Sequence, residues 1–137
     1  MIVAIGAAVS HVKGGIGMGE FASKRFDEPD ETRSFEHGKG EIVHLAGSTA
    51  ARATMEPGWR WSTSVKPIAG TESCQMHHLG YVLSGSLHVV TDEGGELDLG
   101  AGDTYEILPG HDAWVTGDET YQALEFQSTT AKEYAKG

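Results

Sequence analysis

Histidines stand before and near the end of one glycine-rich stretch of this chain, and they are its clearest candidates for chemistry. His77 and His78 come just before residues 80–114, and His111 lies near the end of that stretch. The stretch consists of short β-prone runs separated by glycine-containing turns. Such runs predict strands that roll into a small antiparallel barrel, whose inward side chains converge. Imidazoles carried into that interior from distant strands would bind a metal ion.

The same pattern extends to both sides and predicts the elements that position these histidines. After Pro57-Gly58 we expect a strand that holds Trp59 and Trp61, and then a loop over 64–73. The remaining runs predict strands over 41–47, 48–56, 74–85 (a strand pair or one long bent strand), 86–100 (a hairpin around Glu93-Gly94-Gly95), 101–110, 111–117 and 120–128. Strands about ten residues apart without helices between them predict an all-β sandwich or barrel.

The charge composition of the chain argues against two classes of binding partner. The chain has 137 residues and a formal net charge of −10, from 20 acidic and 10 basic residues. Nucleic acid and anionic membrane are therefore not expected as partners, because both require a basic surface. The single cysteine, Cys74, cannot form an internal disulfide, and the apolar run 2–9 is too short to cross a bilayer. We expect a cytoplasmic protein.

We divide the chain into an N-terminal arm and lead-in (1–40), a β-barrel domain (41–128) and a tail (129–137). Residues 1–20 are small and weakly patterned. They are interpreted as a flexible arm, as an edge strand that packs on a partner subunit, or as an extension upstream of a natural start at Met18. The lead-in is charged, and Pro29 disfavours a helix there. The tail is predicted to be a frayed helical turn or disordered.

Three segments carry a resemblance to a known family. The runs 80–85 (GYVLSG), 95–103 (GELDLGAGD) and 108–110 (LPG) resemble the cupin superfamily over about residues 40–128. The segments PGWRWS, SCQMHHLGYVLSG and PGHDAWV are similar to a small bacterial cupin subfamily. The resemblance implies a double-stranded β-helix, which is a jelly-roll barrel, and a homodimer.

The ligand pattern departs from that family. Metal-binding cupins usually carry a His-x-His pair, a Glu soon after it, and a further His after the Pro-x-Gly turn. In this chain His77 or His78 takes the place of the Glu, and Ala113 takes the place of the last His, with His111 two residues earlier. The His-x-His positions fall near Glu72 and Cys74, or near Thr71 and Ser73. The candidates that remain are Glu72, Cys74, His77, His78 and His111.

The alternation of side chains along a strand predicts which of these candidates face inward and which face outward. If His78 points inward on a regular strand, Cys74 and Glu72 share its face and His77 points outward. A β-bulge would instead bring His77 inward. His111 has the parity of Ala113 and is expected to face the interior. We predict a metal site of His78 and His111 with Cys74 or His77 as the third ligand, which suits Zn²⁺ best and also Fe, Ni, Cu or Mn.

Three functions are consistent with these residues. The first is a small homodimeric, metal-binding cupin that binds or acts on a small organic molecule in the barrel. The second is a metal-free module that binds or senses a small ligand without catalysis, and the third is a structural dimer with a filled barrel. Cys74 would then be a small buried hydrophobe and the histidines packing residues. The sequence does not show whether the protein is an enzyme.

Overall fold

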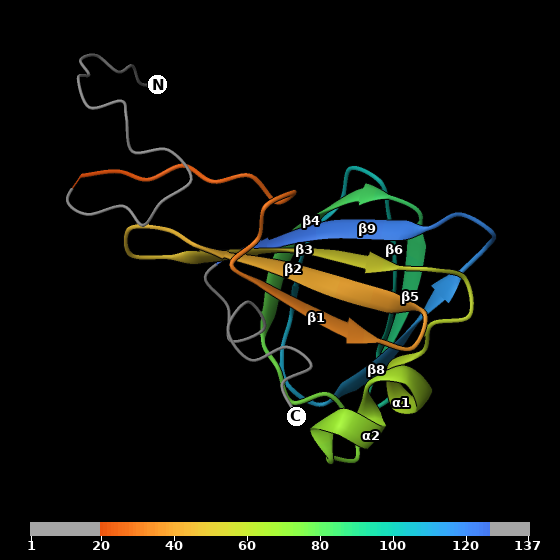
Figure 1. The fold of residues 1–137 in the computed structure, drawn as a ribbon. Helices are drawn as coiled ribbons and strands as arrows, with labels where there is room; N and C mark the ends of the chain where they lie inside the picture. The colour runs from red at the N-terminus through yellow and green to blue at the C-terminus, as the bar shows by residue number, and fades with distance from the viewer. Residues whose placement is uncertain (1–19, 127–137) are drawn as a thin grey trace.

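Two antiparallel β-sheets face each other in the computed structural model, which describes residues 20–126 (Figure 1). One sheet has six strands in the order β1-β2-β3-β9-β4-β7, and the other has three in the order β6-β5-β8. The elements are β1 Glu31–Phe35, β2 Gly38–His44, β3 Thr49–Met55, α1 Trp61–Ser64, α2 Lys66–Ala69, β4 His78–Ser84, β5 Ser86–Thr91, β6 Glu96–Gly100, β7 Thr104–Ile107, β8 His111–Thr116 and β9 Tyr121–Phe126. The all-β prediction is confirmed.

Alternation of side chains along the strands builds the core between the sheets. On β4, for example, His78, Gly80 and Val82 are buried, whereas the residues between them are exposed. The inward residues of both sheets form one main apolar cluster, which includes both tryptophans of the 59–61 segment. Strand parity therefore places His78 inward. The bulge in β4 lies between Val82 and Ser84, downstream of the histidines, and does not change that parity.

Two short helices replace structure that we predicted as extended or irregular. Trp61 begins α1 instead of continuing a strand with Trp59, and α2 lies within the predicted loop 64–73. Pro67 is tolerated in the first turn of α2, where its missing N–H costs no helical hydrogen bond. Gly70 ends α2 in the left-handed conformation (φ 77°). The prediction was wrong because Pro and Gly that interrupt a loop can also begin and end a helical turn.

The six-stranded sheet begins earlier than the predicted start of the barrel. Residues 31–35 and 38–44 pair as an antiparallel hairpin, so eight residues of the predicted lead-in (31–35 and 38–40) belong to the sheet. The remainder of the predicted arm, residues 1–19, lies outside the described residues, as does the tail. No helix among residues 20–126 is long and apolar enough to cross a membrane.

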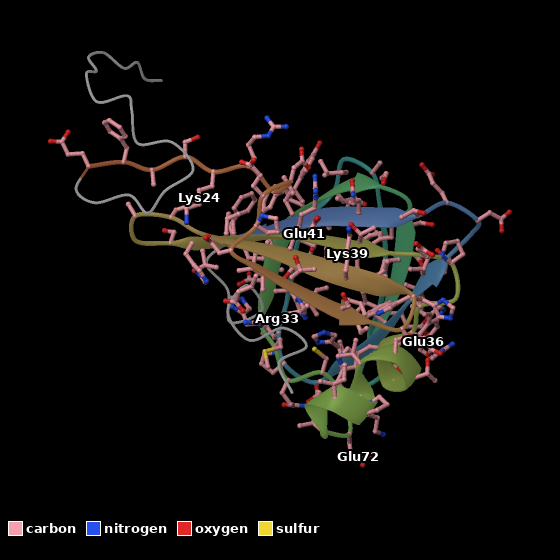
Figure 2. The ribbon with its side chains drawn as sticks, in the orientation of Figure 1. Lys24, Arg33, Glu36, Lys39, Glu41 and Glu72 are labelled. Carbon is pink, nitrogen blue, oxygen red and sulfur yellow. The ribbon has the colours of Figure 1, made fainter. Side chains whose placement is uncertain are left out.

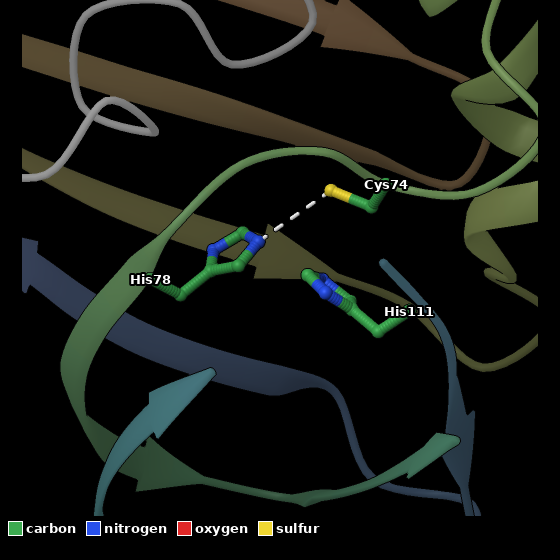
Figure 3. A group of neighbouring side chains, drawn as sticks. All are labelled: Cys74, His78 and His111. Atoms are coloured by element: carbon green, nitrogen blue, oxygen red, sulfur yellow. Dashed lines mark hydrogen bonds between the residues drawn. The ribbon is translucent and has the colours of Figure 1, made fainter. Parts of the chain in front are cut away.

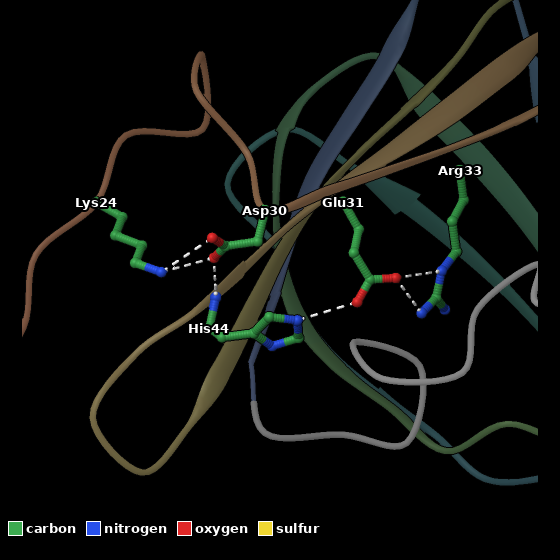
Figure 4. A network of polar contacts seen from close by, with 5 residues as sticks. All are labelled: Lys24, Asp30, Glu31, Arg33 and His44. Atoms are coloured by element: carbon green, nitrogen blue, oxygen red, sulfur yellow. Dashed lines mark hydrogen bonds and ion pairs between the residues drawn. The ribbon is translucent and has the colours of Figure 1, made fainter. Parts of the chain in front are cut away.

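A polar network fastens the chain before β1 to the sheet (Figure 4). Asp30 accepts hydrogen bonds from Lys24 Nζ (2.8 and 3.0 Å) and from the backbone N–H of His44 (2.7 Å). The Lys24 hydrogen bond, followed by that of His44, lowers the pKa of Asp30 below its ordinary value. Beside it, Glu31 joins His44 and Arg33. This network holds the entry into β1 against the end of β2.

Candidate metal centre

Cys74 and His111 are neighbours across a short antiparallel bridge. The N–H of Cys74 donates to the carbonyl of His111 at 2.7 Å, and the Cys74 carbonyl accepts from the N–H groups of Gly110 (2.7 Å) and His111 (3.3 Å). Gly110 has a φ of 97°, which suits glycine and lets the turn before β8 close onto Cys74. Backbone pairing therefore brings together a thiol and an imidazole that are 37 residues apart in the sequence.

His78 completes a group of three buried side chains (Figure 3). Its Nε2 lies 3.6 Å from Cys74 Sγ, and its ring centroid lies 4.9 Å from that of His111. One potential ligand atom from each residue lies within 4.8 Å of the others. Tetrahedral Zn²⁺ with ordinary bond lengths holds a sulfur and a nitrogen ligand about 3.5 Å apart. The spacing of Cys74 and His78 matches that value.

Both imidazoles are held through Nδ1. In His111, Nδ1–H donates to the carbonyl of Leu108 at 2.9 Å. In His78, Nδ1 lies 3.1 Å from each carboxylate oxygen of Glu125. An Nδ1 bonded to an acceptor carries the proton, which leaves the Nε2 lone pair free for a metal. Metal-binding histidines are typically oriented in this way.

Glu125 is itself held in place by a hydrogen bond from Tyr105. The hydroxyl of Tyr105 donates to Oε2 of Glu125 at 2.7 Å. Burial, followed by the negative charge of Glu125, raises the pKa of Tyr105, so its hydroxyl keeps the proton that it donates. Gly80 lies beside this hydrogen bond: a Cβ at position 80 would come within 2.7 Å of Tyr105 Oη and would also meet the carbonyl of Leu124. Glycine at position 80 therefore makes room for the support of His78.

The thiol and the imidazole shift each other's pKa. Burial acts to raise the pKa of Cys74, but hydrogen bonds with His111 and His78 outweigh it and lower this pKa from 9.0 to about 6. Burial acts to lower the pKa of His78, but the charge of Glu125 and the contact with Cys74 raise it from 6.5 to about 10. At neutral pH a thiolate therefore faces an imidazolium. A thiolate is the form of cysteine that binds a metal, and the bound ion would replace the proton on His78.

These side chains line an interior cavity of about 50 Å³. Its polar lining comes from the three candidate ligands together with Glu125, Tyr105 and Tyr121. Its remaining lining is mostly apolar: Ile42, Ala51, Ala53, Met55, Trp59, Trp61, Leu87, Ile107 and Ala113, with Gly40. The candidate ligands therefore face a largely apolar space.

Two sequence candidates lie away from this group. His77 faces outward, and its Nε2 lies 2.8 Å from Glu106. Glu72 is almost fully exposed (98%) and pairs with Lys66, and Figure 2 shows it projecting from the end of the molecule beyond α2. Regular alternation from His78 would have turned Glu72 inward. The chain between Cys74 and His78 is not a regular strand, so that extrapolation was wrong.

Sequence reasoning missed Glu125 and the support from Tyr105. The signal was present in β9, where buried and half-buried residues alternate and Tyr121, Ala123 and Glu125 share the inward face. A carboxylate at an inward position of a strand requires a partner, because burial of an unpaired charge is costly. That requirement points to a buried histidine or cation nearby.

Comparisons with solved structures identify similar folds. A Cupin 2 conserved barrel domain protein from Salinispora arenicola is 17% identical over 70% of this chain and 79% of its own, with a TM-score of 0.51. The polyketide cyclase RemF from Streptomyces resistomycificus is 18% identical over 72% of each chain, with a TM-score of 0.50. A variant of Bacillus subtilis oxalate decarboxylase is 22% identical over 72% of this chain, with a TM-score of 0.50.

The fold implied by the sequence resemblance is confirmed by these likenesses. The match covers 27% of the Bacillus oxalate decarboxylase and 30% of one from Lactobacillus farciminis, so this chain spans less than a third of those enzymes. No protein-family model matches the chain. No curated protein matches it either.

Proposed function

We propose that this chain, which has the cupin fold, binds one divalent transition-metal ion through Cys74 Sγ, His78 Nε2 and His111 Nε2. One thiolate with two imidazoles is a donor set that suits Zn²⁺ best, while iron, nickel, copper and manganese remain alternatives. The observation that carries the proposal is the orientation of the two rings: each Nδ1 is engaged by a fixed acceptor. The Nε2 of His78 thereby faces the sulfur.

Three protein ligands leave a position open for another molecule. Structural zinc sites usually use four protein ligands, whereas three ligands and an open position are typical of sites that bind or activate a small molecule. When bound, the ion would supply Lewis-acid polarisation of a ligand oxygen. The chain's own residues would orient the ligands and exclude water. We therefore propose that the barrel binds or acts on a small organic molecule in the cavity of about 50 Å³.

The first experiment measures metal content in protein purified without a metal-affinity tag. We expect about one equivalent of metal per chain, to be found by elemental analysis. His78→Ala and His111→Ala should each lose it and keep the wild-type circular dichroism spectrum. His77→Ala is the matched control, because its ring is adjacent in sequence but pairs with Glu106 at the surface. A full equivalent in either His78→Ala or His111→Ala would refute the ligand assignment.

The second candidate is a metal-free module that binds a small molecule. The cavity supports it because most of its lining is apolar and would bury a small molecule without help from an ion. The same measurement separates the two candidates. Wild-type protein that takes up no Zn²⁺, even when supplied in excess, would favour the metal-free module over the metal centre.

A homodimer is the proposed assembly. Three large apolar side chains on the outward face of β4 support it, since Leu79, Tyr81 and Leu83 are each 40–47% exposed. A second copy packed on this face would remove that surface from water. Light scattering should give twice the mass of the 137-residue chain. The cytoplasmic location stays a prediction from the use of a single cysteine.

A further inference from the structure

The indole N–H of Trp59 is a buried donor without an acceptor. Trp59 is 3% exposed, and its Nε1 is the one buried side-chain nitrogen or oxygen without a hydrogen-bond partner within residues 20–126. Trp59 also lines the cavity that contains the three candidate ligands. An unpaired buried donor is destabilising, and such a group in a folded protein requires an explanation.

The surroundings of this donor define which acceptor fits. Glu125 already places one buried carboxylate in the cavity wall, with His78 and Tyr105 as its partners. A second carboxylate in the same apolar space would face a like charge at low dielectric, which is costly. A neutral oxygen acceptor carries no such penalty. Without a bound metal ion, the charge of the wall therefore favours a neutral ligand over an anion.

The size and lining of the cavity limit the rest of the ligand. A volume of about 50 Å³ offers on the order of four water-sized positions, at roughly 10–15 Å³ each. The apolar side chains that surround it would bury a short hydrocarbon group favourably. A compact molecule with one oxygen and a few carbons satisfies both requirements.

We infer that the cavity binds a small neutral carbonyl compound, whose oxygen accepts a hydrogen bond from Trp59 Nε1–H. This deepens the proposed function, on which it rests, by naming the ligand class of the same cavity. Trp59 is a positioning residue and a specificity determinant in this account. It selects an oxygen acceptor, while Glu125 disfavours acids.

The test uses the full chain in its metal-free form and acetone as the probe, because a Zn²⁺ ion with an open position would itself bind acetate. The chain has three tryptophans, so its ¹H–¹⁵N spectrum should contain three indole cross-peaks, and the one lost in Trp59→Phe identifies Trp59. Acetone should move the Trp59 indole proton downfield in a saturable manner. In Trp59→Phe the Kd for acetone, followed on other amide peaks, should rise about tenfold, the loss expected for one buried hydrogen bond. Acetate, of similar size, should bind at least about tenfold more weakly than acetone.

The control variant is Trp114→Phe, because Trp114 is half-buried between Arg60 and His88 and does not line the cavity. It should keep the wild-type Kd for acetone. A stationary Trp59 indole peak, or acetate that binds as tightly as acetone, would overturn the inference. If Trp59→Phe does not fold, assignment of the wild-type peak by through-space contacts keeps both criteria available. Because the titration is done without metal, the two proposals are tested separately: Zn²⁺ uptake tests the metal centre, and the Trp59 shift tests the ligand class.

Discussion

Glu125 holds His78 by both carboxylate oxygens, each 3.1 Å from Nδ1, and thereby turns Nε2 toward the sulfur of Cys74. The two residues come from neighbouring strands, β9 and β4, of the six-stranded sheet. The hydroxyl of Tyr105 donates to Glu125 Oε2 and holds the carboxylate beside His78. The contact sets both the proton position and the direction of the ring.

Glu125→Gln should weaken Zn²⁺ binding by about 10- to 100-fold, the usual effect of losing a partner behind a metal-binding histidine. An amide neither stabilises the Nδ1–H tautomer as strongly nor increases the basicity of the ring. Competition with a chromogenic chelator would measure the Kd for Zn²⁺.

Glu106→Gln provides the control for that variant. Glu106 also contacts a histidine through its carboxylate, at 2.8 Å, but the histidine is His77 at the surface. This variant should bind Zn²⁺ as wild type does. Equal losses of affinity in the two variants would mean that net charge, and not the orientation of His78, determines binding.

The thiol of Cys74 should titrate with a pKa of about 6 in metal-free protein. Because this pKa lies below the ordinary value, the thiolate should dominate at pH 7 and be lost as the pH falls below about 6. Absorbance at 240 nm reports the thiolate, and the single cysteine makes its assignment unambiguous. In His78→Ala the pKa should rise, since a hydrogen bond and a positive charge are removed. A wild-type titration near pH 9 would contradict the account.

Gly80→Ala should destabilise the fold by about 1–3 kcal/mol, the usual cost of an overpacked interior. The added methyl would collide with Tyr105 Oη and the Leu124 carbonyl, so the support of Glu125 should also be displaced. Urea denaturation would measure the change in the free energy of unfolding. Gly100→Ala is the control, because a Cβ there meets no atom within 4 Å. Equal stabilities for the two variants would refute the role given to Gly80.

Much of this fold could be predicted from the alternation of apolar and polar residues along the strands and from the glycine-containing turns between them. The hairpin of β5 and β6 around Glu93-Gly94-Gly95 follows the sequence closely, as do β7, β8 and β9. The inward direction of His78 and His111 also follows from parity along their strands. The sequence pattern is therefore enough to predict the structure where a strand is regular and glycine occurs in the adjoining turns.

The remainder depends on contacts that local rules do not describe. Cys74 reaches the site through an isolated bridge to His111, and three residues without regular structure separate it from β4, so parity from His78 does not reach Glu72. Glu125 contacts His78 because β9 pairs with β4, a pairing set by the topology of the whole sheet. Such partners require the tertiary arrangement.

X-ray absorption at the zinc edge of the Zn²⁺-loaded protein tests the central claim most directly. One sulfur at about 2.3 Å together with nitrogen ligands at about 2.0–2.1 Å is the expected first shell. In Cys74→Ser the sulfur contribution should vanish, which would assign it to the single cysteine of the chain. A wild-type spectrum with only oxygen and nitrogen ligands would contradict coordination by Cys74, His78 and His111.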